Sequence, residues 1–162
     1  MTSIALHGFT VPCPAGMDEV KFAQIMNEDM SEVHQYLRNS EGLPAAYLHM
    51  IEVEWKKYLV AAYLNKGVQL GLTKAVDLFA HTHMLFSKKF REFCLNVMNG
   101  WLDHTPTKSE EERLALIPQF KETTLPVLTR LFGAENVPSD IWAPEDAICW
   151  DPCRYTAEEK TA

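Results

Sequence analysis

The sequence predicts an all-α fold, namely a single compact domain of four to six helices with a central helical hairpin and an irregular C-terminal tail. Apolar residues recur at helical spacing through most of the chain. No stretch shows the alternation of apolar and polar residues that marks a half-buried strand. The length of 162 residues is typical of one domain, and the hydrophobic share of 47% is ordinary for a globular protein.

The two ends of the chain are expected to lie outside the helical core. The N-terminal segment contains Pro12 and Pro14 and lacks the basic start and the apolar core of a signal peptide. We therefore interpret residues 1–16 as an extended arm, residues 17–142 as the helical domain and residues 143–162 as the tail.

Two long helices are predicted to open the domain. Residues 17–39 carry apolar side chains near helical spacing, and Gly42 and Pro44 end this helix. Residues 43–65 form a more apolar helix. Its polar positions are supplied by Glu52, Glu54, Lys56 and Lys57. We interpret Glu54 as a solvated charge.

The segment 73–106 is predicted to form the central hairpin. The hydroxyl of Thr73 is expected to cap the first helix by accepting from amides of its first turn. Ser87 is expected to open a second helix after a tight junction, and Gly100 to end it in the left-handed conformation.

A last helix is predicted after this hairpin. Ser109 and Glu112 form the capping-box pattern S-x-x-E at its start. Pro118 and Pro126 interrupt the backbone hydrogen bonding within it, so we expect a kinked or split helix.

The hairpin segment concentrates side chains that bind metals or transfer protons. These are Asp77, His81, His83, Cys94 and His104. Asp77 and His81 lie four residues apart and share a helix face, and folding at the junction would bring Cys94 to the level of His81. His104 follows Gly100 and could return over the same cluster. His81 and His83 are about 200° apart on a regular helix, so both cannot point inward.

Three interpretations of this cluster compete. A His/His/carboxylate set is the usual ligand group of non-haem iron and of some catalytic zinc sites, and Cys94 would favour zinc. A metal-free site would use His81 as the general acid or base, with Asp77 orienting its ring. In the structural interpretation, Asp77 orients His81, Cys94 is a small buried residue, and His83 and His104 lie at the surface.

The same segment carries a family resemblance. The patterns V-D-x-x-x-H-x-H-x-L, S-x-x-F-x-x-F-C and G-W-L-x-H-x-P resemble the central motif of the glycine-rich domain-containing protein-like family. The segments EWKKYL and TLPVLTRLFGAENVPSDIW extend the similarity over residues 54–142. Ala80 stands where the family usually has Trp, and Asp103 stands where it has the first His of a pair. The resemblance implies a helical domain with a His-centred site and supplies no reaction.

We expect the substrate, if there is one, to be a small molecule held in an aromatic pocket. The wall candidates are Tyr58, Phe79, Phe86, Phe90 and Trp101. The net charge of −7 and the pI of about 5.3 argue against nucleic acid or an anionic membrane as partner. The absence of a signal pattern predicts a cytoplasmic protein, and the sequence indicates no oligomeric state.

Other ligand-type residues are given lesser roles. His7 and His34 are expected at the surface, while His49 and Glu52 are neighbours on a helix and serve as spare ligand candidates. The C-x-x-x-C pattern at the C-terminal end could be structural or form a redox pair. The leading hypothesis is a metal-dependent enzyme that uses zinc or iron. The alternatives are a metal-free His acid/base enzyme, of cyclase or isomerase type, and a non-catalytic helical interaction module.

Overall fold

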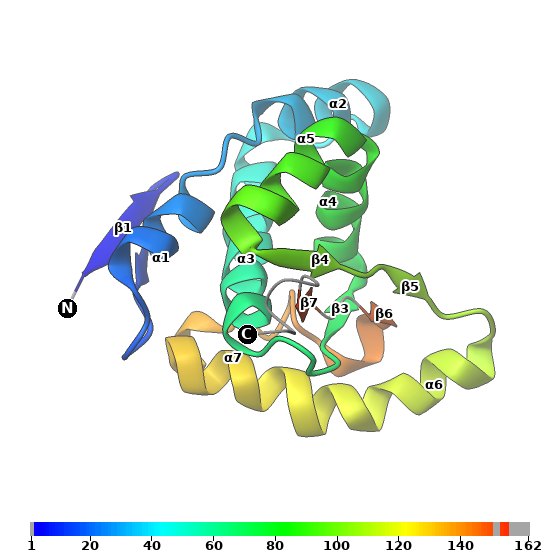
Figure 1. Cartoon of the computed structure of the whole chain (residues 1–162). Helices are drawn as coiled ribbons and strands as arrows, with labels where there is room; N and C mark the ends of the chain where they lie inside the picture. The colour runs from blue at the N-terminus through cyan, green and yellow to red at the C-terminus, as the bar shows by residue number, and fades with distance from the viewer. Residues whose placement is uncertain (1, 151–152, 156–162) are drawn as a thin grey trace.

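A central helix, α3 (Ala45–Leu64), organises the fold. Every residue from Ile51 to Ala62 is buried, the charged ones included. The computed structural model describes residues 2–150 and 153–155. Figure 1 shows α3 behind α5 (Ser87–Phe93), with α2 (Ser31–Glu41) and α4 (Lys74–Leu85) near the same end and the long segment of α6 (Glu110–Gln119) and α7 (Leu125–Phe132) across the other. None of the helices in the described ranges is long and apolar enough to span a bilayer.

The charged residues of α3 are buried as two ion pairs. Lys56 Nζ lies 2.8 Å from Glu52 Oε2, and Lys57 Nζ lies 2.9 Å from Glu54 Oε2. Trp142 Nε1 also donates to Glu54 Oε1 over 2.9 Å. The interpretation of Glu54 as a solvated charge is therefore wrong, because these partners satisfy the carboxylate inside the core.

The other helices surround α3. They are α1 (Glu19–Met26), α2 (Ser31–Glu41), α4 (Lys74–Leu85), α5 (Ser87–Phe93), α6 (Glu110–Gln119) and α7 (Leu125–Phe132). A π-helical turn, Cys94–Met98, continues α5, and a second one, Phe120–Thr124, joins α6 to α7. Short 3₁₀ turns occupy Ala134–Asn136 and Pro144–Asp146.

The prediction of one helix over residues 17–39 is wrong, because the chain breaks between α1 and α2 at residues 27–30. Several other predicted helix boundaries are confirmed. The break between α4 and α5 falls at Phe86, and Ser109 Oγ accepts from the Glu112 amide at the start of α6. The proline-rich helix is split by its π turn. Two capping details differ: the Thr73 hydroxyl donates to the Ile141 carbonyl, and Asn99, not Gly100, takes the left-handed conformation.

The prediction of an all-α fold with an irregular tail is wrong. The protein is 62% helical, but 13% of it is strand, which makes it mixed α/β. The strands are β1 (Ser3–Leu6), β2 (Phe9–Pro12), β3 (Gly71–Thr73), β4 (Gly100–Leu102), β5 (Thr105–Pro106), β6 (Ala147–Trp150) and β7 (Cys153–Tyr155). They pair antiparallel in the orders β1-β2, β3-β6-β5 and β4-β7. Strands of two to four residues are too short to show an alternating pattern.

The N-terminal hairpin, β1-β2, occupies the segment interpreted as an extended arm. His7 and Gly8 form its two-residue turn, and both have positive φ angles, 52° and 85°. Turns of this type match the twist of the flanking strands. The turn brings His7 into contact with Glu52 on α3.

Candidate functional site

Asp77, His104 and Cys149 converge on one small site. The Cys149 thiol donates to Asp77 Oδ1 over 3.1 Å, and His104 Nε2 lies 3.6 Å from the same oxygen. One ligand atom from each of the three residues lies within 4.8 Å of the others. Asp77 and His104 are about one-fifth exposed, whereas Cys149 is buried. The site therefore has a buried thiol at its base and two half-buried ligands toward solvent.

The three-stranded sheet β3-β6-β5 brings these residues together. Asp77 lies in the first turn of α4, which begins directly after β3. β6 pairs with β3 on one side and with β5 on the other, so Cys149 lies opposite both Leu72 and Pro106. His104 immediately precedes β5. The strands that sequence patterning missed are thus what assemble the site.

The two ligand-atom distances from Asp77 suit a tetrahedral metal. Zinc bonds of about 2.0 Å to nitrogen and oxygen and about 2.3 Å to sulfur would separate the ligand atoms by about 3.3–3.5 Å. The observed separations from Asp77 Oδ1 are 3.1 Å to Cys149 Sγ and 3.6 Å to His104 Nε2. The three residues could hold a divalent metal after small side-chain adjustments and loss of the thiol proton.

His81 lies at the edge of this site. It follows Asp77 by one turn of α4, and its ring centroid lies 5.7 Å from that of His104. His81 is exposed. It lies beside His104 but does not supply one of the converging ligand atoms.

His83 belongs to the core and not to this site. Its Nδ1 accepts from Trp55 Nε1 over 3.1 Å, and its ring packs against Phe90 and Phe93. Burial, followed by the charge of Lys56, lowers the pKa of His83 to about 3. His83 is therefore a neutral core histidine that accepts the Trp55 hydrogen bond and packs against the two phenylalanines.

Cys94 is also separate from the converging ligands. It begins the π turn after α5 and is buried. Burial raises the pKa of its thiol to about 11, although a main-chain hydrogen bond from Leu102 opposes the shift. A buried thiol with this pKa behaves as an apolar side chain.

The predicted aromatic pocket is dispersed. Tyr58 and Phe79 are fully buried in the core, Phe90 packs on His83 and Trp101 is exposed. Phe86 contacts the ring of Tyr36 at the α4–α5 break. The predicted Cys149–Cys153 relationship stays a prediction, because the Cys153 side chain lies outside the described residues.

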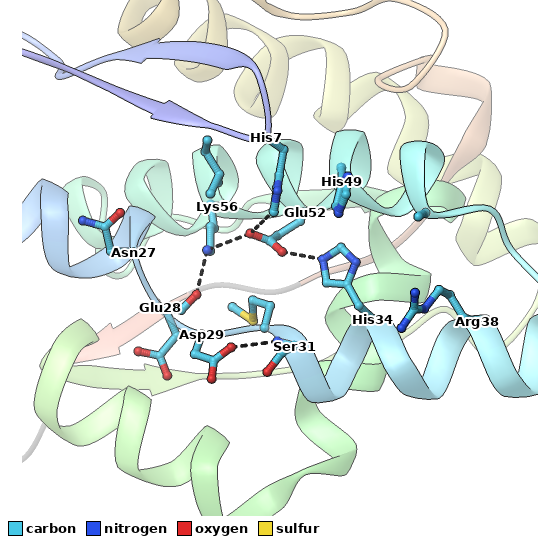
Figure 2. A pocket seen from close by; sticks show the side chains of 13 residues that line it. His7, Asn27, Glu28, Asp29, Ser31, His34, Arg38, His49, Glu52 and Lys56 are labelled. Carbon is cyan, nitrogen blue, oxygen red and sulfur yellow. Dashed lines mark hydrogen bonds and ion pairs between the residues drawn. The ribbon is translucent and has the colours of Figure 1, made fainter.

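A second ligand-type group surrounds Glu52 on α3, as Figure 2 shows. His34 Nε2 lies 2.5 Å from Glu52 Oε1, and His7 Nε2 lies 3.1 Å from Glu52 Oε2. These residues line a pocket of about 380 Å³ together with His49 and Lys56. Sequence reasoning retained Glu52 and His49 as spare ligands. It placed His7 and His34 at the surface; His7 is exposed and His34 is partly buried. Their contact with Glu52 was not predicted, because no local pattern indicates that the hairpin turn meets α3.

The carboxylate of Glu52 is stabilised as an anion. Burial alone would raise its pKa, but hydrogen bonds from His34, Lys56 and His7 and the charge of Lys56 lower the pKa to about 2. Lys56 Nζ also donates to the Glu28 carbonyl over 2.7 Å. The lysine ammonium thus occupies the position beside the carboxylate that a bound cation would otherwise take.

A comparison of the chain with protein-family models, with curated proteins and with solved structures finds no match. The resemblance to the glycine-rich domain-containing protein-like family therefore stays a prediction.

Proposed function

We propose that Asp77, His104 and Cys149 hold a divalent transition metal, and that the protein uses it in the chemistry of a small molecule. The observation that supports this most directly is the convergence of three different ligand types from α4, the β4–β5 connection and β6. The Asp77 carboxylate bonds to a thiol and an imidazole in the described part of the chain. Neither partner carries a fixed positive charge that would compete with a metal ion.

The donor set favours zinc over iron. A thiolate is a soft ligand, and Cys/His/carboxylate sites with one open position are typical of catalytic zinc. The exposed sides of Asp77 and His104 leave room for a fourth ligand from solvent. Such a metal lowers the pKa of a water ligand to about 7.

His81 would then act as a proton acceptor at the mouth of the site. It lies beside His104, is exposed and is one turn from Asp77. The metal-free alternative, in which His81 is the general acid or base with Asp77 behind it, would need Asp77 to turn from His104, whose Nε2 lies 3.6 Å from Asp77 Oδ1. We place the protein in the reducing cytoplasm, because Cys149 must remain reduced to bind a metal as its thiolate.

Metal titration of the untagged, demetallated protein tests the proposal. We expect one equivalent of zinc to bind in competition with a chromophoric chelator, and cobalt to give the charge-transfer band of a thiolate ligand. Cys149→Ala should abolish the band and weaken zinc binding at least about 100-fold.

Cys94→Ala is the matched control, since it removes another buried thiol from the same domain. It should retain both zinc binding and the cobalt band. A wild-type protein that binds neither metal would overturn the proposal, and so would equal losses in the two cysteine variants.

A further inference from the structure

The pocket beside Glu52 is built from four segments of the chain. The turn of the β1-β2 hairpin supplies His7, the loop before α2 supplies Glu28 and Asp29, α2 supplies His34 and Arg38, and α3 supplies His49, Glu52 and Lys56. Figure 2 shows these side chains around one cavity, with the acidic residues of the loop and Arg38 toward opposite ends. Its volume of about 380 Å³ is in the range of small-molecule sites.

The charge of Glu52 is already balanced. Its side chain is 4% exposed and lies 2.8 Å from the ammonium of Lys56, which is itself buried. A further cation next to this pair would meet the lysine charge at short range in a weakly polarisable interior. The group is therefore unsuited to a metal ion, although it contains two imidazoles and a carboxylate.

Three imidazoles lie beside this carboxylate, and two of them, those of His7 and His34, contact it. The rings of His7 and His49 are stacked, with centroids 4.0 Å apart and an angle of 11° between their planes. The ring of His34 lies 5.7 Å from the first and 5.1 Å from the second. A proton gained by this cluster adds positive charge beside Lys56, and Glu52, which already pairs with Lys56, offsets that charge only in part.

Arg38 adds to the positive charge at the same end of the pocket. It is exposed, and in the part of the chain that the structure describes it makes neither a hydrogen bond nor an ion pair. Glu28 and Asp29 lie toward the other end of the pocket (Figure 2), where the Asp29 carboxylate accepts from the Ser31 amide and Lys89 pairs with Glu32. The positive charge of Arg38 is therefore separated from the acidic residues that line the pocket.

The pKa of His49 reflects its burial and the positively chargeable groups around it. It is lowered first by burial and then by the charges of His7 and His34, with Arg38 contributing in the same direction and Glu52 opposing them. An anion bound between Arg38 and the imidazoles would reverse these repulsions and favour the protonated ring.

From this arrangement we propose that the pocket binds a small organic molecule through an anionic group, a carboxylate or a phosphate, and that the imidazole cluster takes up a proton as the anion binds. Arg38 would contact the anion, since guanidinium groups match both anions in a two-pronged geometry. The Glu52–Lys56 pair would hold His34 and His7 in place from below.

The test uses the full chain and follows the histidine ring signals by NMR while sodium acetate is added, with sodium chloride as the ionic-strength control. Acetate should shift the His34 and His49 signals in a saturable manner at about pH 6. Its binding should weaken by at least about tenfold by about pH 8, because one proton is taken up with each anion. A parallel titration with inorganic phosphate at about pH 6 distinguishes a phosphate ligand from a carboxylate ligand.

Arg38→Gln is the informative variant, and Arg91→Gln, which removes an exposed arginine from α5, is its matched control. We expect Arg38→Gln to weaken anion binding at least about tenfold and Arg91→Gln to leave it unchanged. Saturable shifts with either anion would support the proposal. It would be overturned if both anions gave no more shift than chloride, if both arginine variants behaved alike, or if zinc bound this pocket and His34→Ala removed that binding.

Discussion

Two carboxylates in this protein, those of Glu52 and Asp77, contact imidazoles. They differ in whether a buried ammonium group already balances their charge. Glu52 is buried, bonds to His7 and His34, and has the ammonium of Lys56 beside it. Asp77 is partly exposed and bonds to the Cys149 thiol and the His104 imidazole. The residue types are similar, but only the first carboxylate already has its cation. The identity of the third partner therefore separates a charge-balanced pocket from a candidate metal centre.

Removing the two carboxylates one at a time should give the largest difference in the free energy of unfolding. Glu52→Ala leaves Lys56 buried without its partner, which should lower the free energy of unfolding by about 3–5 kcal/mol. Asp77→Ala removes a partly exposed group and should cost less than about 1 kcal/mol in the metal-free protein. Urea unfolding of both variants measures the difference. Equal losses would show that the two carboxylates play the same structural role.

The next largest effect should be a loss of stability in acid, as the Glu52 carboxylate becomes protonated. Its pKa is about 2 in the folded protein and about 4.5 in the unfolded chain. The contribution of ionised Glu52 to the free energy of unfolding is therefore complete above pH 4.5 and is lost as the pH falls toward 2. The shift corresponds to about 3 kcal/mol. The stability of wild type minus that of Glu52→Gln should shrink over this range, and a constant difference would contradict the assignment.

Zinc should stabilise the protein through the other carboxylate. At a free zinc concentration about 100 times the dissociation constant, binding should raise the free energy of unfolding by about 2.7 kcal/mol. The Glu52→Gln protein should gain the same increment, because its substitution lies in the other cluster. Urea midpoints with and without zinc report the gain, which should be absent in Asp77→Asn.

Substituting the two histidines of the H-x-H motif, His81 and His83, should give a smaller difference in the free energy of unfolding. His83→Ala leaves a cavity and removes the acceptor of the Trp55 N–H, so it should cost about 2 kcal/mol. His81→Ala changes an exposed side chain and should cost less than about 0.5 kcal/mol. A stability cost at His81 equal to that at His83 would place His81 in the core and argue against its role at the site.

Local patterns were sufficient to locate most helices of this protein. The α4–α5 break at Phe86, the Ser109 cap and the proline-split last helix follow from capping and proline geometry within a few residues. The same patterns identified Asp77, His81 and His104 as a group of interest, and the structure brings the first and last together with His81 beside them. These features depend on interactions between residues that are close in the sequence, so the sequence by itself determines them.

Tertiary structure alone decided which residues complete each cluster. Cys149 lies 72 residues from Asp77 and reaches it only because β6 pairs with β3 and β5. His7 reaches Glu52 only because the hairpin turn lies on α3, and the charged residues of α3 are buried because each finds a partner there. Such pairings depend on which distant segments meet, and strands of two to four residues carry too little pattern to predict that.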